Sequence, residues 1–262
     1  MKFDSETAEA EWMYLYGKNA PAALDATVDR LRSGVVFHMR NDPIDYWSQA
    51  VGFTEPATAD LLDEIMAYYR GQNAQTFTVN FAPDLLPPDF AELAAARGLV
   101  ETGTKMKLGG EAAGVKSAVT DLRIDQVTAA DAAEFGEVVA TGFSTPGTPL
   151  SGMIASAVTA PNSQAFAAWD GDTMVAGGVL LVHGDVGALH SGSTLPAYRN
   201  RRAQSALIAA RAEAARKAGC RWVITETASP GPDRPNSSFN NMRRAGLDVL
   251  YPRAIWRWTS GN

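Results

Sequence analysis

Residues 194–210, TLPAYRNRRAQSALIAA, contain the point at which a strand gives way to a long helix, and this stretch decides the fold. The helix is predicted over 196–218 because small and apolar residues recur along one stripe, and Gly219 provides its end. The strand before it is predicted over 186–194. A strand that leads into a helix leaves the first backbone amides of the helix exposed at the turn.

Three arginines, Arg199, Arg201 and Arg202, lie at this turn. The free amides and the dipole of a helix N-terminus favour a negatively charged group, and nearby guanidinium groups add to that preference. The chain as a whole has a net charge of -6, so the basic cluster does not reflect a basic composition. The turn is predicted to bind a phosphate-like anion; the alternative is a solvated helix start that only keeps the protein in solution.

Outward from this helix, the second half of the chain is predicted to have the element order β-α-α-β-β-β-α-β-α-β. Alternating or continuous apolar runs mark the strands, and apolar residues three and four positions apart mark the helices. The predicted strands are 122–127, 164–169, 174–183, 186–194, 221–227 and 247–258. The predicted helices are 129–141, 150–159, 196–218 and 237–245, with a loop at 229–236.

The first half has a similar ending. One or two short helices are predicted over 6–31, followed by strands 35–40, 45–53, 75–82 and 99–108 and by helices 58–72 and 87–97. Both halves end in strand, helix, strand, helix, strand, which suggests duplication of one unit. The glycine-rich segment 109–117 is predicted to be a linker between domains 1–112 and 118–262. The fold class is therefore α/β, with a central mixed sheet flanked by helices in each domain.

Composition excludes several classes of protein. The 262 residues are 46% hydrophobic and 20% charged, which is typical of globular proteins. The acidic net charge argues against a nucleic-acid partner, and the apolar run around 179–182 is far shorter than the ~18 residues of a membrane helix. A single cysteine, Cys220, excludes an internal disulfide, and the three histidines lack metal-ligand spacing. We therefore expect no bound metal. The N-terminus has no apolar signal core, so we expect a cytoplasmic protein.

The second half resembles the GNAT superfamily of acyl-CoA-dependent N-acyltransferases in element order and in the turn at 194–205. The family signature, R/Q-x-x-G-x-G/A, holds the pyrophosphate of coenzyme A through backbone amides. Arg199 stands at the first signature position, Arg202 where the first glycine belongs, and Gln204 where the second small residue belongs. The resemblance thereby implies a cofactor-binding set of Thr194, Leu195, Arg199, Asn200, Arg201, Arg202, Ala203, Gln204, Ser205 and Asn241.

Within that set, the resemblance implies that backbone groups of Thr194 and Leu195 bond the pantetheine arm and the acetyl carbonyl, and that Asn241 contacts the cofactor from a short helix. Arg202 is a departure from the family pattern. Glycine lets the diphosphate approach the backbone, whereas a long side chain must swing aside. If it does, its guanidinium binds a phosphate; if it does not, the site is closed.

Catalytic candidates are fewer. Many GNAT enzymes use a tyrosine on the short helix as general acid, but Met242 occupies that position here. Glu226, in an apolar strand, is the candidate base, because burial raises the pKa of a carboxyl group unless a cation pairs with it. The alternative for Glu226 is a structural salt bridge. His190 is a candidate for proton transfer through a water and Tyr251 for the acid; for both, the alternative is packing.

In the first half the matching turn, 53–60, has acids and neither arginine nor glycine, so this half is interpreted as a degenerate copy that shapes the acceptor site. Its acids Glu55, Asp60 and Asp63 would suit a cationic amine. Its aromatic residues wall a cleft between the domains or belong to the core: Trp12, Tyr14, Tyr46, Trp47, Tyr68 and Tyr69.

The expected function is an acetyl-CoA-dependent N-acetyltransferase that acts on a primary amine of a small molecule or peptide. The expected assembly is a monomer or homodimer. The alternatives are a non-catalytic module that binds coenzyme A or another anion, and an interaction protein that binds no cofactor.

Overall fold

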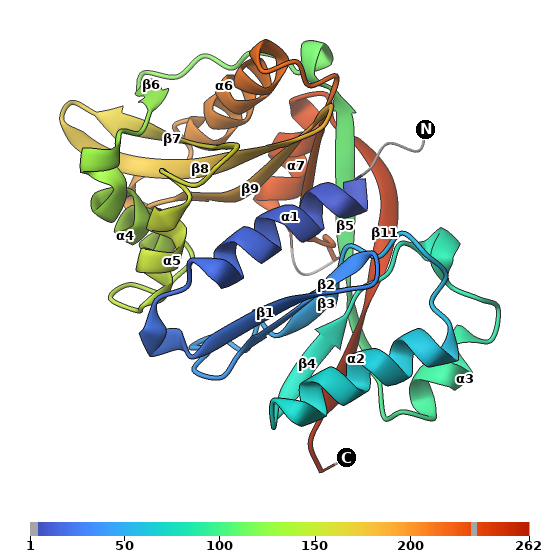
Figure 1. Cartoon of the computed structure of the whole chain (residues 1–262). Helices are drawn as coiled ribbons and strands as arrows, with labels where there is room; N and C mark the ends of the chain where they lie inside the picture. The colour runs from blue at the N-terminus through green and yellow to red at the C-terminus, as the bar shows by residue number, and fades with distance from the viewer. Residues whose placement is uncertain (1–4, 232–234, 262) are drawn as a thin grey trace.

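The computed structural model describes residues 5–231 and 235–261, and its strands form a single 11-stranded sheet (Figure 1). The order of strands across the sheet is β1-β2-β3-β4-β11-β5-β10-β9-β8-β7-β6. The strands are β1 Ala26–Leu31, β2 Gly34–Met39, β3 Gln49–Val51, β4 Thr76–Val79, β5 Val100–Glu111, β6 Arg123–Gln126, β7 Ser163–Asp170, β8 Thr173–His183, β9 Val186–Thr194, β10 Trp222–Ala228 and β11 Asp248–Thr259.

Helices cover both faces of this sheet, as expected for an α/β protein (Figure 1). They are α1 Ser5–Lys18, α2 Ala59–Gly71, α3 Phe90–Ala95, α4 Ala132–Gly142, α5 Leu150–Ser156, α6 Ala203–Lys217 and α7 Ser237–Arg244. Within the described ranges, none of these helices has the length and apolar character needed to cross a membrane.

The two halves of the chain exchange their last strands. Strand β5 ends the first half, yet it pairs with β10 of the second half from Trp222↔Glu111 to Ala228↔Lys105. Strand β11 ends the chain, yet it pairs with β4 of the first half. In the centre of the molecule β5 and β11 lie side by side and antiparallel (Figure 1). The expected boundary between domains 1–112 and 118–262 separates the two halves in the sequence, but the exchanged strands join these halves into one sheet.

The predicted duplication agrees with the sheet topology. Each half contains one parallel pair, β3 with β4 and β9 with β10, and a long helix connects the two strands of each pair, α2 in the first half and α6 in the second. All other pairings in the sheet are antiparallel. The two halves thus repeat one pattern on either side of the central β11 and β5 pair.

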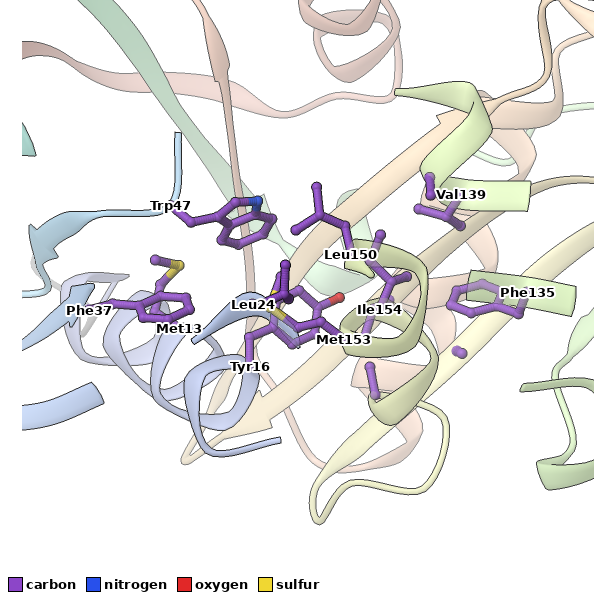
Figure 2. Packing of buried hydrophobic residues seen from close by; sticks show 14 of the residues in the cluster. Met13, Tyr16, Leu24, Phe37, Trp47, Phe135, Val139, Leu150, Met153 and Ile154 are labelled. Carbon is purple, nitrogen blue, oxygen red and sulfur yellow. The ribbon is translucent and has the colours of Figure 1, made fainter. Parts of the chain in front are cut away.

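Helix α1 joins the halves on one face of the sheet. It packs on β1 and β2 of the first half and on β8 and β9 of the second. The largest apolar cluster spans this junction, and Figure 2 shows Met13, Phe37 and Trp47 of the first half facing Leu150 and Ile154 of α5. On the opposite face α2 covers the first half of the sheet, and α6 and α7 cover the second.

The structure corrects three predictions. Residues 26–31 form β1, not part of a helical segment; Val28 faces the core while Asp29 and Arg30 are exposed. The predicted linker begins too early, because residues 109–111 are the end of β5 and pair with β10, and Gly110 lies opposite Val223. The predicted strand 45–53 shrinks to β3. Part of the predicted loop 229–236 lies outside the described residues.

Candidate functional site

Two cavities meet where β9 and β10 separate. These strands pair only from Val186↔Trp222 to Ala188↔Ile224, and beyond that point they diverge. One cavity, of about 980 Å³, is lined by the turn before α6, by α7 and by 116–119; we call it the turn cavity. The other, of about 470 Å³, lies between α1, β5, β9 and β10; we call it the inner cavity. The residues that line both are Phe143, Gly192, Gln204 and Ser238.

The turn before α6 has an unusual backbone. Asn200 and Arg202 have φ values of 68° and 61°, in the left-handed region. Asparagine tolerates this conformation, whereas for arginine it carries a steric cost of about 1–2 kcal/mol. Arg202 is also the N-cap of α6, and no side chain in the described ranges caps this helix end. The left-handed conformation explains why glycine suits this position, and the uncapped amides remain available to a ligand.

The three arginines of the turn differ in their partners. Arg201 is clamped between Asp121 and Asp170, with its Nη1 2.7 Å from Asp170 Oδ2. Thr120 fixes the same turn by donating a hydrogen bond to the carbonyl oxygen of Arg201 at 2.7 Å. Arg199 and Arg202 line the turn cavity and pair with no acid in the described part of the chain. Arg201 does not line the turn cavity; bound to two aspartates, it holds the turn in place, and its expected contact with a phosphate stays a prediction.

A chain of polar side chains connects α6 to α7. Asn241 donates to Gln204 Oε1 at 2.7 Å, and Gln204 donates to Ser238 Oγ at 2.9 Å. Together with Ala203 and Ser205, these residues line the turn cavity, as the sequence-based set implied. Gln204 and Ser238 lie where the two cavities join, so this chain of hydrogen bonds shapes the passage between them.

Of the two residues at the end of β9 that were expected to contact the cofactor, only one lies at the turn cavity. Thr194 lines the turn cavity. Leu195 does not line either cavity, and its backbone is engaged within the fold, because its amide donates to Val175 and its carbonyl accepts from Tyr198. The structure therefore does not bring Leu195 to either cavity, and its expected contact with pantetheine stays a prediction. Gly192, which lines both cavities, is the strand residue at the junction.

A bulge in β9 creates this junction. The pairing with β8 shifts by one residue between Gly177↔Ser193 and Val179↔His190. Ser191, within the shift, has a φ of 50° and shares a hydrogen bond of 2.7 Å with Tyr16 of α1. A bulge of this kind interrupts the ladder and turns backbone groups away from the neighbouring strand.

His190 is a packing residue in this structure. Its ring stacks on Trp12 with centroids 4.7 Å apart and meets Tyr16 edge-on. Burial, with a smaller contribution from the charge of Arg211, lowers the pKa of His190 to about 3. The imidazole lines the inner cavity but is neutral and weakly basic at neutral pH. This state argues against the expected role in proton transfer.

Glu226 belongs to a buried cluster of six acidic and basic side chains joined by ion pairs. Its carboxylate contacts Arg253, lies 3.3 Å from Lys105 Nζ and lies 3.8 Å from Lys107 Nζ. Arg253, which is 0% exposed, also binds Glu6 and Glu9. The six members of this ion cluster are Glu6, Glu9, Glu226, Lys105, Lys107 and Arg253. Its three acids balance its three bases, so the salt bridge considered as the alternative for Glu226 is present.

Tyr251 does not reach either cavity. Its hydroxyl is bonded to Glu6 and lies 3.1 Å from Ser5 Oγ, and burial raises its pKa above the usual value. The structure therefore does not bring the expected acid to the site. Met242 does line the inner cavity, as expected for the position of the missing tyrosine.

The sequence reasoning missed three charged cavity residues from the first half. Glu9, Lys105 and Lys107 line the inner cavity beside Glu226. Lys105 and Lys107 are two apart on β5 and so share one face of the sheet, and Glu6 and Glu9 are three apart on α1 and share one face of that helix. This spacing was the available signal. Its meaning depended on β5 pairing with β10, which the sequence does not reveal.

The loop 41–48 supplies the apolar wall of the inner cavity. Its residues Ile44, Tyr46 and Trp47 line the cavity, and Asp42 holds the loop by accepting three backbone amide hydrogens. Trp12 completes this aromatic wall, so part of the expected aromatic cleft is present.

The acids expected to face an amine are elsewhere. Glu55 binds Ser33 and Arg32, and Asp63 binds Arg97. Neither these two nor Asp60 lines either cavity. In this half the N-terminus of α2 is capped by Thr58, which accepts from the amide of Leu61. The N-terminus of α2, which would correspond to the α6 turn, therefore has fewer free amide groups for an anion.

Comparison with known proteins gives a family for the second half. Residues 130–233 match the model of the acetyltransferase (GNAT) family. A search of curated proteins by sequence finds no match.

Solved structures share the fold over the whole chain. A GCN5-related N-acetyltransferase from Kribbella flavida is 13% identical, with a TM-score of 0.67 over 100% of this chain and 98% of that one. A tandem GNAT protein from the clavulanic acid biosynthesis pathway is 15% identical, with a TM-score of 0.59 over 97% and 94%. A putative acetyltransferase from Novosphingobium aromaticivorans is 16% identical, with a TM-score of 0.55 over 96% and 97%. At these identities the likeness establishes a tandem GNAT fold.

Proposed function

Because residues 130–233 carry an acetyltransferase domain of the GNAT family within a tandem GNAT fold, we propose that the protein transfers an acetyl group from acetyl-CoA to a primary amine. The observation that carries this proposal is the pair of joined cavities at the α6 turn. One has the groups that suit a diphosphate, and the other has the size and lining of a small-molecule site.

The turn cavity fits coenzyme A. The amides of Ala203, Gln204 and Ser205 begin α6, and a diphosphate at this helix end would also meet the guanidinium groups of Arg199 and Arg202. Arg202 is exposed and lines the cavity wall, which supports the interpretation that it swings aside and contacts a phosphate. Asn241 and Gln204 form the wall toward α7.

The bound thioester supplies an activated acyl group: the amine nitrogen forms a bond to its carbonyl carbon, the C–S bond breaks, and the sulfur leaves as a thiolate. The chain must orient the amine, exclude water and accept one proton from the nitrogen. Of the expected catalytic residues, Glu226 is the carboxyl side chain that lines the inner cavity, so we assign it the base role. Lys105, 3.3 Å from it, is a donor at the same wall.

The acceptor occupies the inner cavity in this proposal. The walls from Trp12, Tyr46 and Trp47 are aromatic, and the floor holds the ion cluster. A small amine with an apolar or aromatic body fits such a lining better than a hydrophilic polyamine, because each aromatic side chain contributes apolar contact area. The first half thus takes part in acceptor recognition through its loop 41–48 and not through the acids of α2.

Thermal unfolding with acetyl-CoA tests the cofactor. At about 100 times its dissociation constant the ligand adds roughly 2.7 kcal/mol, which raises the Tm by about 5–10 °C. Adenosine alone is the control and should give no comparable rise. Arg202→Gly should weaken the affinity about tenfold if the guanidinium contacts phosphate, and a gain in affinity would show that Arg202 obstructs the turn. No rise with acetyl-CoA in the unmodified protein would contradict the proposal.

A specific observation also favours a non-catalytic module that binds coenzyme A. Glu226 is engaged with three cations, His190 is packed and neutral, and Tyr251 lies outside the cavities. Turnover separates the two functions. With a panel of arylalkylamines and acetyl-CoA, free thiol should appear, and Glu226→Gln should lower the rate at least tenfold while the exposed Glu213→Gln does not. Cofactor binding without thiol release in the whole panel would favour the module.

A further inference from the structure

Arg211, in the middle of α6, is a buried cation held by backbone carbonyls. Its side chain is 3% exposed. Its Nε donates to Leu207 at 3.0 Å, and its Nη1 donates to the carbonyl oxygens of Val179 and His190, each at 3.1 Å. The last two carbonyls lie beside the bulge that interrupts the pairing of β8 and β9. Arg211 therefore bonds backbone groups at the point where the ladder is irregular.

Gly178 makes room for this guanidinium. A Cβ atom at Gly178 would lie 2.7 Å from Arg211 Cζ, so any other residue there would force the guanidinium to shift. A Cβ atom at Gly192 would lie 3.5 Å from Arg211 Nη2. Nη2 is thus directed at the bulge residue that lines both cavities, and it makes no hydrogen bond within the described part of the chain. Arg211 itself lines the inner cavity.

Arg211 also lacks a counter-ion. In the ranges 5–231 and 235–261 no carboxylate forms an ion pair with it. The cavity acids Glu9 and Glu226 are already balanced within the ion cluster by Lys105, Lys107 and Arg253. Burial lowers the pKa of Arg211 to about 10, so the side chain still carries its charge at neutral pH. An uncompensated buried charge is costly, and a bound anion removes that cost.

We propose that Arg211 recognises a carboxylate on a substrate, so that the inner cavity takes a molecule whose carboxylate lies close to the reacting group. The proposal rests on the acyltransferase function proposed above. Two sources of the carboxylate share this chemistry: the acyl chain of a dicarboxylic acid thioester, or an acceptor of the α-amino acid type. Because Nε and Nη1 of Arg211 already donate to backbone carbonyls, Nη2 is the nitrogen that can donate a charged hydrogen bond to a carboxylate oxygen.

Matched ligands distinguish the two sources. The donor arm compares succinyl-CoA with acetyl-CoA, and the acceptor arm compares L-phenylalanine with 2-phenylethylamine in the presence of coenzyme A. Binding is measured by calorimetry. We expect the carboxylate-bearing member to bind at least tenfold more tightly in one arm, because a charged hydrogen bond in a buried site contributes that much or more. Equal affinities in both arms of the unmodified protein would overturn the proposal without any variant.

Variants place the effect at Arg211. Arg211→Met should reduce the ratio to about twofold or less, and Arg211→Lys, which keeps the charge on a shorter side chain, should retain part of it. Arg216→Met is the control on the same helix, because Arg216 is exposed and paired with Glu213, and it should leave the ratio unchanged. If Arg211→Met does not fold, Arg211→Lys decides. A full ratio in every folded Arg211 variant would overturn the assignment.

The affinity for coenzyme A alone separates this inference from the proposed function. Arg211 does not line the turn cavity, so coenzyme A should bind equally to the unmodified protein and to Arg211→Met. Absence of coenzyme A binding to the unmodified protein would contradict the acyltransferase function. Normal coenzyme A binding with no preference for a carboxylate would contradict only the inference on Arg211.

Discussion

Arg253→Met should be among the most damaging single substitutions in this protein. Arg253 on β11 is 0% exposed and is bonded to Glu6, Glu9 and Glu226. Removal of its charge leaves three buried acids with two lysines. Loss of one partner of a buried ion pair costs about 3–5 kcal/mol, which corresponds to a fall in Tm of about 6–20 °C at about 2–4 °C per kcal/mol. Differential scanning calorimetry measures this fall.

Arg257→Met is the matched control on the same strand. Arg257 pairs with Asp45, but the two side chains are 31% and 57% exposed. An exposed pair contributes about 0–1 kcal/mol, so the fall in Tm should stay below about 4 °C. Glu9→Gln combined with Arg253→Met should recover part of the loss, because the double change removes one unpaired acid. Equal falls in Tm for Arg253→Met and Arg257→Met would refute the argument that the buried ion pairs of Arg253 stabilise the fold more than an exposed pair does.

Two further predictions concern the site. The pKa of His190 is about 3 in the folded chain and about 6.5 in the unfolded chain. As the pH falls, the unfolded chain therefore binds a proton before the folded chain does. Between pH 6.5 and 5 this difference lowers the free energy of unfolding by about 2 kcal/mol. Urea unfolding of His190→Gln should lack this part of the pH dependence, and an unchanged slope would contradict the burial argument. For coenzyme A affinity, Arg199→Ala should lose about tenfold and Arg201→Ala less than threefold, because Arg201 is already held by two aspartates; the reverse order in calorimetry would contradict the assignment of the turn.

Local patterns were sufficient to predict most elements of this fold. The alternation of β7 and β8 depends on neighbours in the sequence, and their predicted ranges differ from the observed ones by few residues. The apolar stripe also predicted α6, but this helix begins at Ala203 and not at residue 196. Residues 196–198 form a separate short 3-10 turn, and the left-handed backbone of Arg202 delays the start of the helix. The loop before β3 was predicted as strand because its aromatic residues favour strands. There the carboxylate of Asp42 accepts the amide hydrogens of Ile44, Tyr46 and Trp47, and a local side-chain acceptor of this kind competes with sheet pairing.

The candidate site was less predictable, because long-range pairing assembles it. The turn residues Arg199 to Ser205 are contiguous in the sequence, so their pattern pointed to one place. Lys105 and Glu226 are far apart in the chain and meet only because β5 pairs with β10. The role of Arg201 depended on Asp121 and Asp170, which lie before β6 and at the end of β7, both earlier in the chain. Patterns within a segment cannot show which charges lie across from it.

The exchange of strands explains how the first half takes part in the site, although its turn before α2, residues 53–60, contains no basic residue. Strand β5 belongs to the first half by sequence, but it supplies Lys105 and Lys107 to the floor of the inner cavity. Because β11 returns to pair with β4, neither half can complete its sheet alone. The first half therefore contributes walls of the inner cavity through the loop 41–48 and through α1, although the turn before α2 has no arginine. The helix turn of the second half would hold the cofactor, and the first half would select the molecule that meets it.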